Sequence, residues 1–172
     1  MGDSFIAYLQ QLELMVFFCG YPLLYALVIF FSRNEGRPEN FRSRMSRFLP
    51  YAYALIGTLY LGLQLKNLYP DYSIYNIRHT ILHPYLTIWG LLSLLFWIPA
   101  ISRRKVLSLF HSLVFLFFLL RDIVLQIIGS LPNNDLLQND MRVYITSFLL
   151  NVGAFIIILI LSFLLFSTKR KW

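Results

Sequence analysis

The chain has 172 residues, of which 58% are apolar, 17% aromatic and only 13% charged, and its formal net charge is +7. A typical soluble domain is about 45–50% apolar and about 25% charged, so the composition excludes a disordered chain and a free-standing nucleic-acid-binding module, and it favours a small polytopic membrane protein. The single cysteine, Cys19, excludes an internal disulfide framework and a cysteine-based zinc site.

Five apolar stretches are long enough, or nearly so, to cross a bilayer. A spanning helix needs about 20 mostly apolar residues, because each adds about 1.5 Å across about 30 Å of hydrocarbon. In chain order, the predicted spans cover residues 14–32, 48–65, 84–101, 106–128 and 143–167, and the alternative for the first is an extension upstream through the apolar residues 5–9. The second and third are short and carry Tyr, Thr, Gly and Gln, so four spans are the competing interpretation, with the first or second stretch lying in the interface. The predicted fold is an all-α helical bundle that forms one transmembrane domain, residues 1–172.

Proline positions refine the predicted helices. Pro50 and Pro84 fall in the first turns of their spans, where a missing backbone N–H costs little. Pro22 follows Gly20 inside the first span, so we expect that helix to be kinked or locally open there.

Basic residues gather on one side of the five-span topology. They are Arg33, Arg37, Arg42, Arg44 and Arg47 before the second span, Arg103, Arg104 and Lys105 between the third and fourth, and Lys169, Arg170 and Lys171 after the fifth. The opposite loops contain Lys66, Arg78 and Arg142. Because cytoplasmic loops are enriched in Lys and Arg, this asymmetry predicts an N-terminus outside and a C-terminus inside. A four-span count would scatter the basic loops over both faces.

The same basic residues indicate the surroundings of the protein. We expect them to face anionic lipid headgroups at the cytoplasmic surface, so no nucleic-acid partner is predicted. We also expect a multi-pass protein of the inner or plasma membrane. The N-terminal sequence lacks the basic region and the cleavage site of a signal peptide. The longest predicted connection, residues 66–83, leaves no room for a soluble catalytic domain.

Ionisable residues inside the fourth span form the main candidate site, because such groups are costly in hydrocarbon. Wound at about 100° per residue, His111, Phe118, Asp122 and Gln126 form one stripe. Arg121 points about 100° away from Asp122, so the two are not expected to face each other. Arg121 is long enough to reach the interface, whereas Asp122 needs a partner from another helix. Such a stripe is either an ion, proton or headgroup site or an interhelical contact that fixes packing or docks a partner subunit.

Two further helical faces carry small or weakly polar residues, which allow helices to approach closely in lipid. The face of the fifth span comprises Ser147, Asn151, Ala154, Ile158 and Ser162, and that of the second comprises Tyr53, Gly57, Tyr60 and Gln64. We expect Asn151 to pair with Asp122 or Gln126. Both faces are interpreted as packing surfaces, with a pore lining or a self-association face as the alternative.

Two histidines at the end of the outer-side loop between the second and third spans raise the question of a metal or headgroup site. His79 and His83 have the i, i+4 spacing that places two imidazoles on one helical face. Asp71 could add a carboxylate. Pro84 follows directly, so a hydrogen-bonded surface pair is the favoured interpretation, and no cofactor is predicted.

The sequence contains no Walker, Rossmann, G-x-S-x-G or C-x-x-C signature. The leading hypothesis is therefore a structural, accessory or self-assembling subunit of a membrane complex, without catalytic chemistry, whose partners are copies of itself or other membrane subunits. The alternative is a homo-oligomeric channel lined by the polar faces of the fourth and fifth spans. A third hypothesis is an intramembrane enzyme that acts on lipid through His79, His83 and Asp71.

Overall fold

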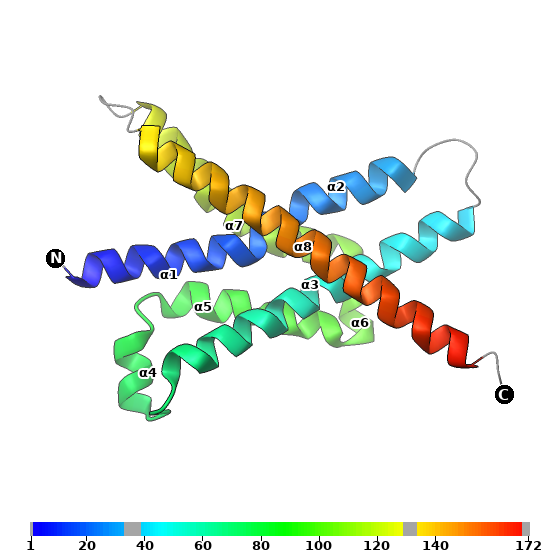
Figure 1. Cartoon of the computed structure of the whole chain (residues 1–172), viewed down its shortest axis with the longest axis horizontal. Helices are drawn as coiled ribbons and strands as arrows, with labels where there is room; N and C mark the ends of the chain where they lie inside the picture. The colour runs from blue at the N-terminus through cyan, green and yellow to red at the C-terminus, as the bar shows by residue number, and fades with distance from the viewer. Residues whose placement is uncertain (1, 33–38, 129–133, 170–172) are drawn as a thin grey trace.

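The computed structural model describes residues 2–32, 39–128 and 134–169, and this part of the chain is helical apart from short turns (Figure 1). The helices are α1 (Gly2–Phe18), α2 (Tyr21–Ser32), α3 (Glu39–Leu68), α4 (Ile74–Thr80), α5 (Pro84–Leu91), the 3-10 helix η1 (Leu92–Trp97), α6 (Pro99–Ser102), α7 (Lys105–Ile128) and α8 (Asn134–Lys169). The predicted all-α fold is confirmed for the described residues.

Four stretches of the described residues are long and apolar enough to cross a membrane. They are Gln10–Phe31, Met45–Leu68, Lys105–Leu125 and Asn139–Leu164, and the first of them combines most of α1 with α2. They overlap the first, second, fourth and fifth predicted spans. Hydropathy therefore located the long apolar helices correctly.

The third predicted span, residues 84–101, is not one continuous helix. Its apolar part, Pro84–Trp97, is shorter than a standard spanning helix and changes from α to 3-10 geometry at Leu92. Ile98 then has an extended backbone (φ −74°, ψ 120°), as expected for a residue before proline, because the ring of Pro99 disfavours the helical conformation at the preceding residue. The prediction of a single helix is wrong because Pro99 ends it.

The first predicted span is broken where the sequence indicated. α1 ends at Phe18 and α2 begins at Tyr21, so Cys19 and Gly20 form the junction and Pro22 is the second residue of α2. At this junction the chain passes very close to α8, because a Cβ atom added to Gly20 would lie 2.3 Å from the backbone nitrogen of Phe148. Only glycine fits this crossing.

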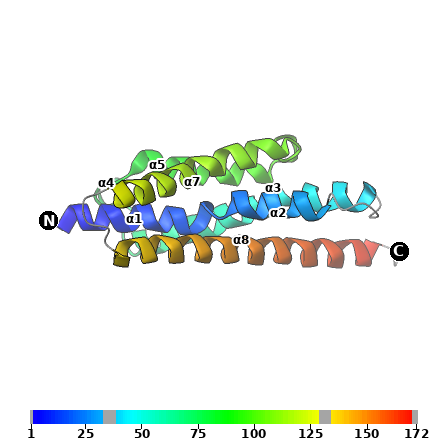
Figure 2. The ribbon, with the colours of Figure 1, turned by 90° about the horizontal axis from the view of Figure 1, so that it is seen from above.

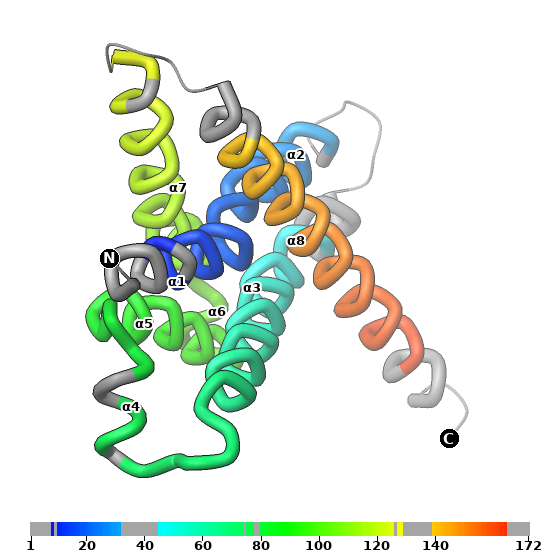
Figure 3. Tube along the Cα trace, turned by 60° about the vertical axis from the view of Figure 1, so that its left-hand side comes forward, coloured from blue at the N-terminus to red at the C-terminus, as the bar shows by residue number. Residues whose placement is uncertain are grey.

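Seen from above, α1 and α2 lie between α7 and α8 (Figure 2). α3 crosses α8 and packs against it and against η1 (Figure 3). The centre of the bundle is aromatic: the rings of Phe18 and Phe115 stack with centroids 4.8 Å apart, and those of Tyr21 and Tyr53 lie 4.4 Å apart. The first pair joins α1 to α7, and the second joins α2 to α3.

The two ends of the molecule differ in the segments that they contain. The N-terminus, the end of α3, α4 and the start of α5 lie at one end, whereas the end of α2, the start of α3, the junction of α6 with α7 and the end of α8 lie toward the other (Figure 1). The segment α5–η1–α6 leads from the first end toward the second.

Of the basic residues predicted to set the topology, those that the structure describes belong to this second end. Arg47, Arg103 and Arg104 are exposed there, and Lys105 is partly buried. The side chains of Arg42, Arg44 and Lys169 are not described, and Arg33, Arg37, Arg170 and Lys171 lie outside the described residues.

Candidate functional site

His111, in the second turn of α7, is buried and joins three helices through hydrogen bonds. Its Nε2 lies 2.7 Å from the backbone carbonyl oxygen of Trp89 in α5, and its Nδ1 lies 2.7 Å from the hydroxyl of Tyr53 in α3. A carbonyl oxygen only accepts, so Nε2 carries the proton and Nδ1 accepts a hydrogen bond from the Tyr53 hydroxyl. Both ring nitrogens are therefore used for contacts between helices.

The surroundings of the His111 imidazole are aromatic. The indole of Trp89 stacks on it with a centroid distance of 4.9 Å and an interplanar angle of 6°, and the indole Nε1 donates to the His111 carbonyl oxygen at 3.3 Å. The rings of Phe18, Phe96 and Phe115 lie within 6.5 Å of it. Because His111 is buried among these rings, a hydrogen bond lost here leaves a polar group unsatisfied in an apolar environment, which is costly.

The polar face of α8 is turned toward the break between α1 and α2. Ser147 and Asn151 are both fully buried. The backbone N–H of Gly20 donates to Oγ of Ser147 at 2.7 Å, and Nδ2 of Asn151 donates to the backbone oxygens of Phe17 and Ser147, each at 2.9 Å. Phe17 lies in the last turn of α1, where backbone carbonyls lack helical partners. The α8 side chains thus satisfy backbone groups that the break leaves free.

This arrangement corrects the expectation that Asn151 pairs with Asp122, whereas the alternative partner, Gln126, has a side chain outside the described part of the structure. Asp122 lies six residues before the end of α7 at Ile128, whereas Asn151 lies seventeen residues after the start of α8 at Asn134. Since the two helices run in opposite directions from their connection, the difference in depth is roughly 16 Å. Asn151 of α8 and Asp122 of α7 therefore lie at different levels in the bundle.

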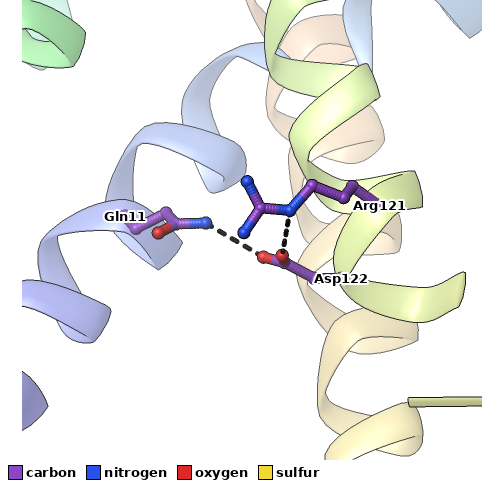
Figure 4. A network of polar contacts seen from close by, with 3 residues as sticks. All are labelled: Gln11, Arg121 and Asp122. Carbon is purple, nitrogen blue, oxygen red and sulfur yellow. Dashed lines mark hydrogen bonds and ion pairs between the residues drawn. The ribbon is translucent and has the colours of Figure 1, made fainter. Parts of the chain in front are cut away.

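Asp122 instead takes its partner from α1. Nε2 of Gln11 donates to Oδ2 of Asp122 at 2.9 Å, and Nε of Arg121 lies 3.8 Å from Oδ1 (Figure 4). The Arg121 side chain is 55% exposed and that of Asp122 21% exposed. The expectation that Arg121 and Asp122 do not face each other is therefore wrong, because the long arginine side chain curls back along the helix to its neighbour. The side chain of Gln126 is not described.

Two substitutions of Asp122 are expected to distinguish the contribution of its hydrogen bond to stability from the contribution of its charge. Asp122→Asn keeps an oxygen that accepts from Gln11, so the free energy of unfolding should change little. Asp122→Leu removes that acceptor and should lower the stability by about 1–2 kcal/mol, which is the scale of hydrogen bonds between membrane helices. Thermal unfolding of the purified protein in lipid nanodiscs measures both variants, and equal melting temperatures for the two would contradict the assigned contact.

The residues proposed for a metal or headgroup site do not form the helical face that their spacing presupposes. α4 ends at Thr80 and Ile81 is extended, so His79 and His83 lie on either side of a break. Asp71 accepts hydrogen bonds from the backbone N–H and the hydroxyl of Ser73, which fixes the turn before α4. His83 precedes α5 without a side-chain capping bond, and the side chain of His79 is not described.

Three polar residues near the start of the first span were missed from the sequence. Gln10 accepts a hydrogen bond from the backbone N–H of Leu82 at 3.0 Å and donates to the carbonyl oxygen of Thr80, which ties α1 to the segment before α5. Gln11 binds Asp122, and one carboxyl oxygen of Glu13 is buried with no hydrogen-bond partner among the described residues. The predicted span began after these residues. The apolar run at residues 5–9 was the signal that the helix extends further back.

The described polar contacts form a series of links between helices. The bonds of His111, of Ser147 with Asn151, and of Asp122 each join α7 or α8 to an earlier helix. Within the described residues, no group of three or more His, Cys, Asp or Glu side chains is placed to hold a metal ion. Comparison with known proteins yields no match to any family model, curated protein or solved structure, so the function has to be inferred from this geometry.

Proposed function

We propose that the chain crosses the membrane five times, in the plasma or inner membrane, with its N-terminus outside and its C-terminus in the cytoplasm. The weakest crossing is Pro84–Trp97, which would reach about 21 Å as an ordinary α-helix. Its last six residues form η1, and because a 3-10 helix rises about 2.0 Å per residue, the segment reaches about 24 Å. The short helix α6 extends it further, toward the end of the molecule that carries Arg47, Arg103 and Arg104.

Cysteine labelling tests this orientation. With Cys19 replaced by serine, single cysteines are introduced as Asp3→Cys and Arg170→Cys and treated in intact cells with a membrane-impermeant maleimide. We expect labelling at position 3 without permeabilisation and at position 170 only after it, because an odd number of crossings places the two ends on opposite sides. Labelling of both positions from the same side would rule out five crossings.

We further propose that the protein is a structural subunit of a membrane assembly and contacts a second membrane-embedded chain through α7. The observation that carries this proposal is the position of Arg121, a charged residue in an apolar helix whose side chain is 55% exposed. Charged side chains within membrane spans usually face other protein, since exposure to hydrocarbon is costly. Exposed apolar neighbours flank Arg121 on α7, among them Phe117 and Leu125.

The internal polar groups support the same role. His111, Ser147 and Asn151 bind backbone or side-chain groups of other helices in the same chain, which is the use expected of a packing element. The alternative is a homo-oligomeric channel lined by α7 and α8. Because Ser147 and Asn151 are buried against α1, such a channel would need a lining made of other residues.

Site-specific photo-crosslinking tests the subunit role. A photoreactive phenylalanine analogue at Phe117 reports on the face beside Arg121, and the same analogue at Phe163, an exposed position of α8, serves as the matched control. We expect a discrete protein adduct from position 117, identified by mass spectrometry as a second copy or another membrane protein. The adduct should be lost in Arg121→Gln, because the substitution removes the exposed charged group through which the partner is proposed to bind.

Two results would contradict the proposal. The first is an adduct with lipid alone at position 117, which would show that Arg121 extends to the headgroups. The second is the same protein adduct at both positions, unaffected by Arg121→Gln. A closed ring of copies with cation flux in liposomes would favour the channel instead.

A further inference from the structure

A basic pocket opens between the start of α3, α6 and the start of α7. Its volume is about 540 Å³, and it is lined by Arg47, Tyr51, Pro99, Ser102, Arg103 and Lys105. Three of these six residues are cationic and none is acidic. Residues separated by some fifty positions in the sequence thus place three positive charges around one cavity.

The walls of this pocket are held by hydrogen bonds and ring contacts. Nζ of Lys105 lies 2.5 Å from Oγ of Ser46, which fixes the start of α7 against α3. Oγ of Ser102 donates to the carbonyl oxygen of Pro99 at 3.3 Å within α6. The ring of Tyr51 lies 6.3 Å from that of Trp97. The cavity is therefore framed by three elements that contact one another, while the side chains of Arg47 and Arg103 are exposed around it.

The chemistry of the lining points to phosphate. A guanidinium group offers several N–H donors in one plane and binds phosphate oxygens in a bidentate manner, and a lysine adds a point charge. Cavities of about 300–1,000 Å³ are typical of sites for small molecules, so this one has room for a polar group attached to the phosphate. Basic pockets between membrane helices on the cytoplasmic side are suited to phospholipid headgroups.

We propose that this pocket is a specific binding site for a phosphate monoester attached to glycerol, as in the headgroup of phosphatidic acid or in glycerol phosphate. Such a site differs from a general attraction of basic loops to an anionic surface, because the binding depends on two particular side chains, those of Arg47 and Arg103. It is independent of the contact proposed around Arg121, which lies toward the opposite end of α7.

Native mass spectrometry of the full-length protein tests the site. The protein is titrated in neutral detergent with phosphatidic acid, whose headgroup is a phosphate monoester, and separately with phosphatidylcholine. We expect wild-type protein to bind phosphatidic acid about tenfold more tightly, a difference of about 1.4 kcal/mol. The double variant Arg47→Gln/Arg103→Gln should lose this preference. The control Arg104→Gln/Arg142→Gln removes the same charge at exposed positions outside the pocket and should keep it.

The outcomes are distinguishable. Loss of the preference in the pocket variant alone supports the proposal, whereas equal binding by the two variants, or no preference in the wild type, overturns it. Competition with inorganic phosphate and glycerol phosphate identifies the source: displacement of the lipid at millimolar concentration assigns the site to soluble phosphate esters, and retention assigns it to lipid. If the double variant does not fold, Arg47→Gln and Arg103→Gln are measured singly, and an unchanged preference in both overturns the proposal.

Discussion

Replacing Gly20 by alanine is expected to destabilise the protein by roughly 3 kcal/mol, the upper end of the usual cost of overpacking. The added methyl carbon would lie 2.3 Å from the backbone nitrogen of Phe148 and 2.5 Å from the carbonyl carbon of Ser147. These are backbone atoms of α8, which cannot rotate away as a side chain does. The helix would have to move, and the 2.7 Å hydrogen bond from the Gly20 N–H to Ser147 would break with it.

Gly153→Ala is the matched control for this substitution. Gly153 also lies in a membrane-spanning stretch, in α8, but a Cβ atom added there meets nothing within 4 Å. Alanine favours a helix over glycine by about 1 kcal/mol, so this variant should be as stable as the wild type or slightly more stable. Thermal unfolding in nanodiscs measures both variants. Equal melting temperatures for Gly20→Ala and Gly153→Ala would contradict the close crossing of the α1–α2 junction and α8.

Replacing His111 by leucine is expected to cost about 3 kcal/mol, because it leaves the buried Tyr53 hydroxyl without a partner, at a cost of about 1–3 kcal/mol, and removes a further hydrogen bond worth about 1 kcal/mol. The Tyr53 hydroxyl and the Trp89 carbonyl oxygen are both bonded to the imidazole at 2.7 Å, and the Trp89 oxygen keeps the backbone N–H of Leu92 as a donor. Tyr53→Phe removes only one of the bonds and should cost about 1 kcal/mol. Both variants are measured by unfolding in nanodiscs.

The double variant separates the contact from other effects of the substitutions. If the Tyr53–His111 bond exists, the losses in His111→Leu and Tyr53→Phe should not add, and the difference should be about 0.5–1 kcal/mol. His83→Leu is the control, because His83 makes no capping bond at the start of α5, and it should change stability by less than about 0.5 kcal/mol. Strict additivity, or an equal effect of His83→Leu, would remove His111 from the proposed network.

The long helices were predictable from the sequence because their signal is local. A stretch such as Lys105–Leu125 is recognised by its own length and hydropathy, and the break at Gly20 is indicated by the adjacent Pro22. The end of the third predicted span was placed too far along the chain, because the predicted helix, residues 84–101, continued past Pro99. The apolar pattern continues upstream of Leu14, so the predicted start of the first span left out Gln11 and Glu13.

The partners of the polar residues were less predictable because they depend on rotation and depth together. The helical period puts His111 and Asp122 on one stripe of α7, and both side chains bond to other helices, but the period carries no information about which helix lies opposite. Asn151 is buried, and its level in the bundle matches the end of α1 rather than Asp122. The bond between Gln11 and Asp122 joins positions 111 residues apart, and no pattern in a single sequence encodes such a pairing.

The short apolar segment Pro84–Trp97 has a consequence for biosynthesis. Insertion machinery selects segments largely by their apolar length, and fourteen residues followed by Pro99 give a weak signal when they emerge from the ribosome. In the five-crossing arrangement, this segment would stay in the bilayer only if it packs against neighbouring helices, which are inserted either before it or after it. α3 precedes it and contacts η1. α7 follows it, and the carbonyl oxygen of His111 in α7 accepts a hydrogen bond from the indole of Trp89. The central third of the chain would therefore reach its final topology only after α7 has been translated.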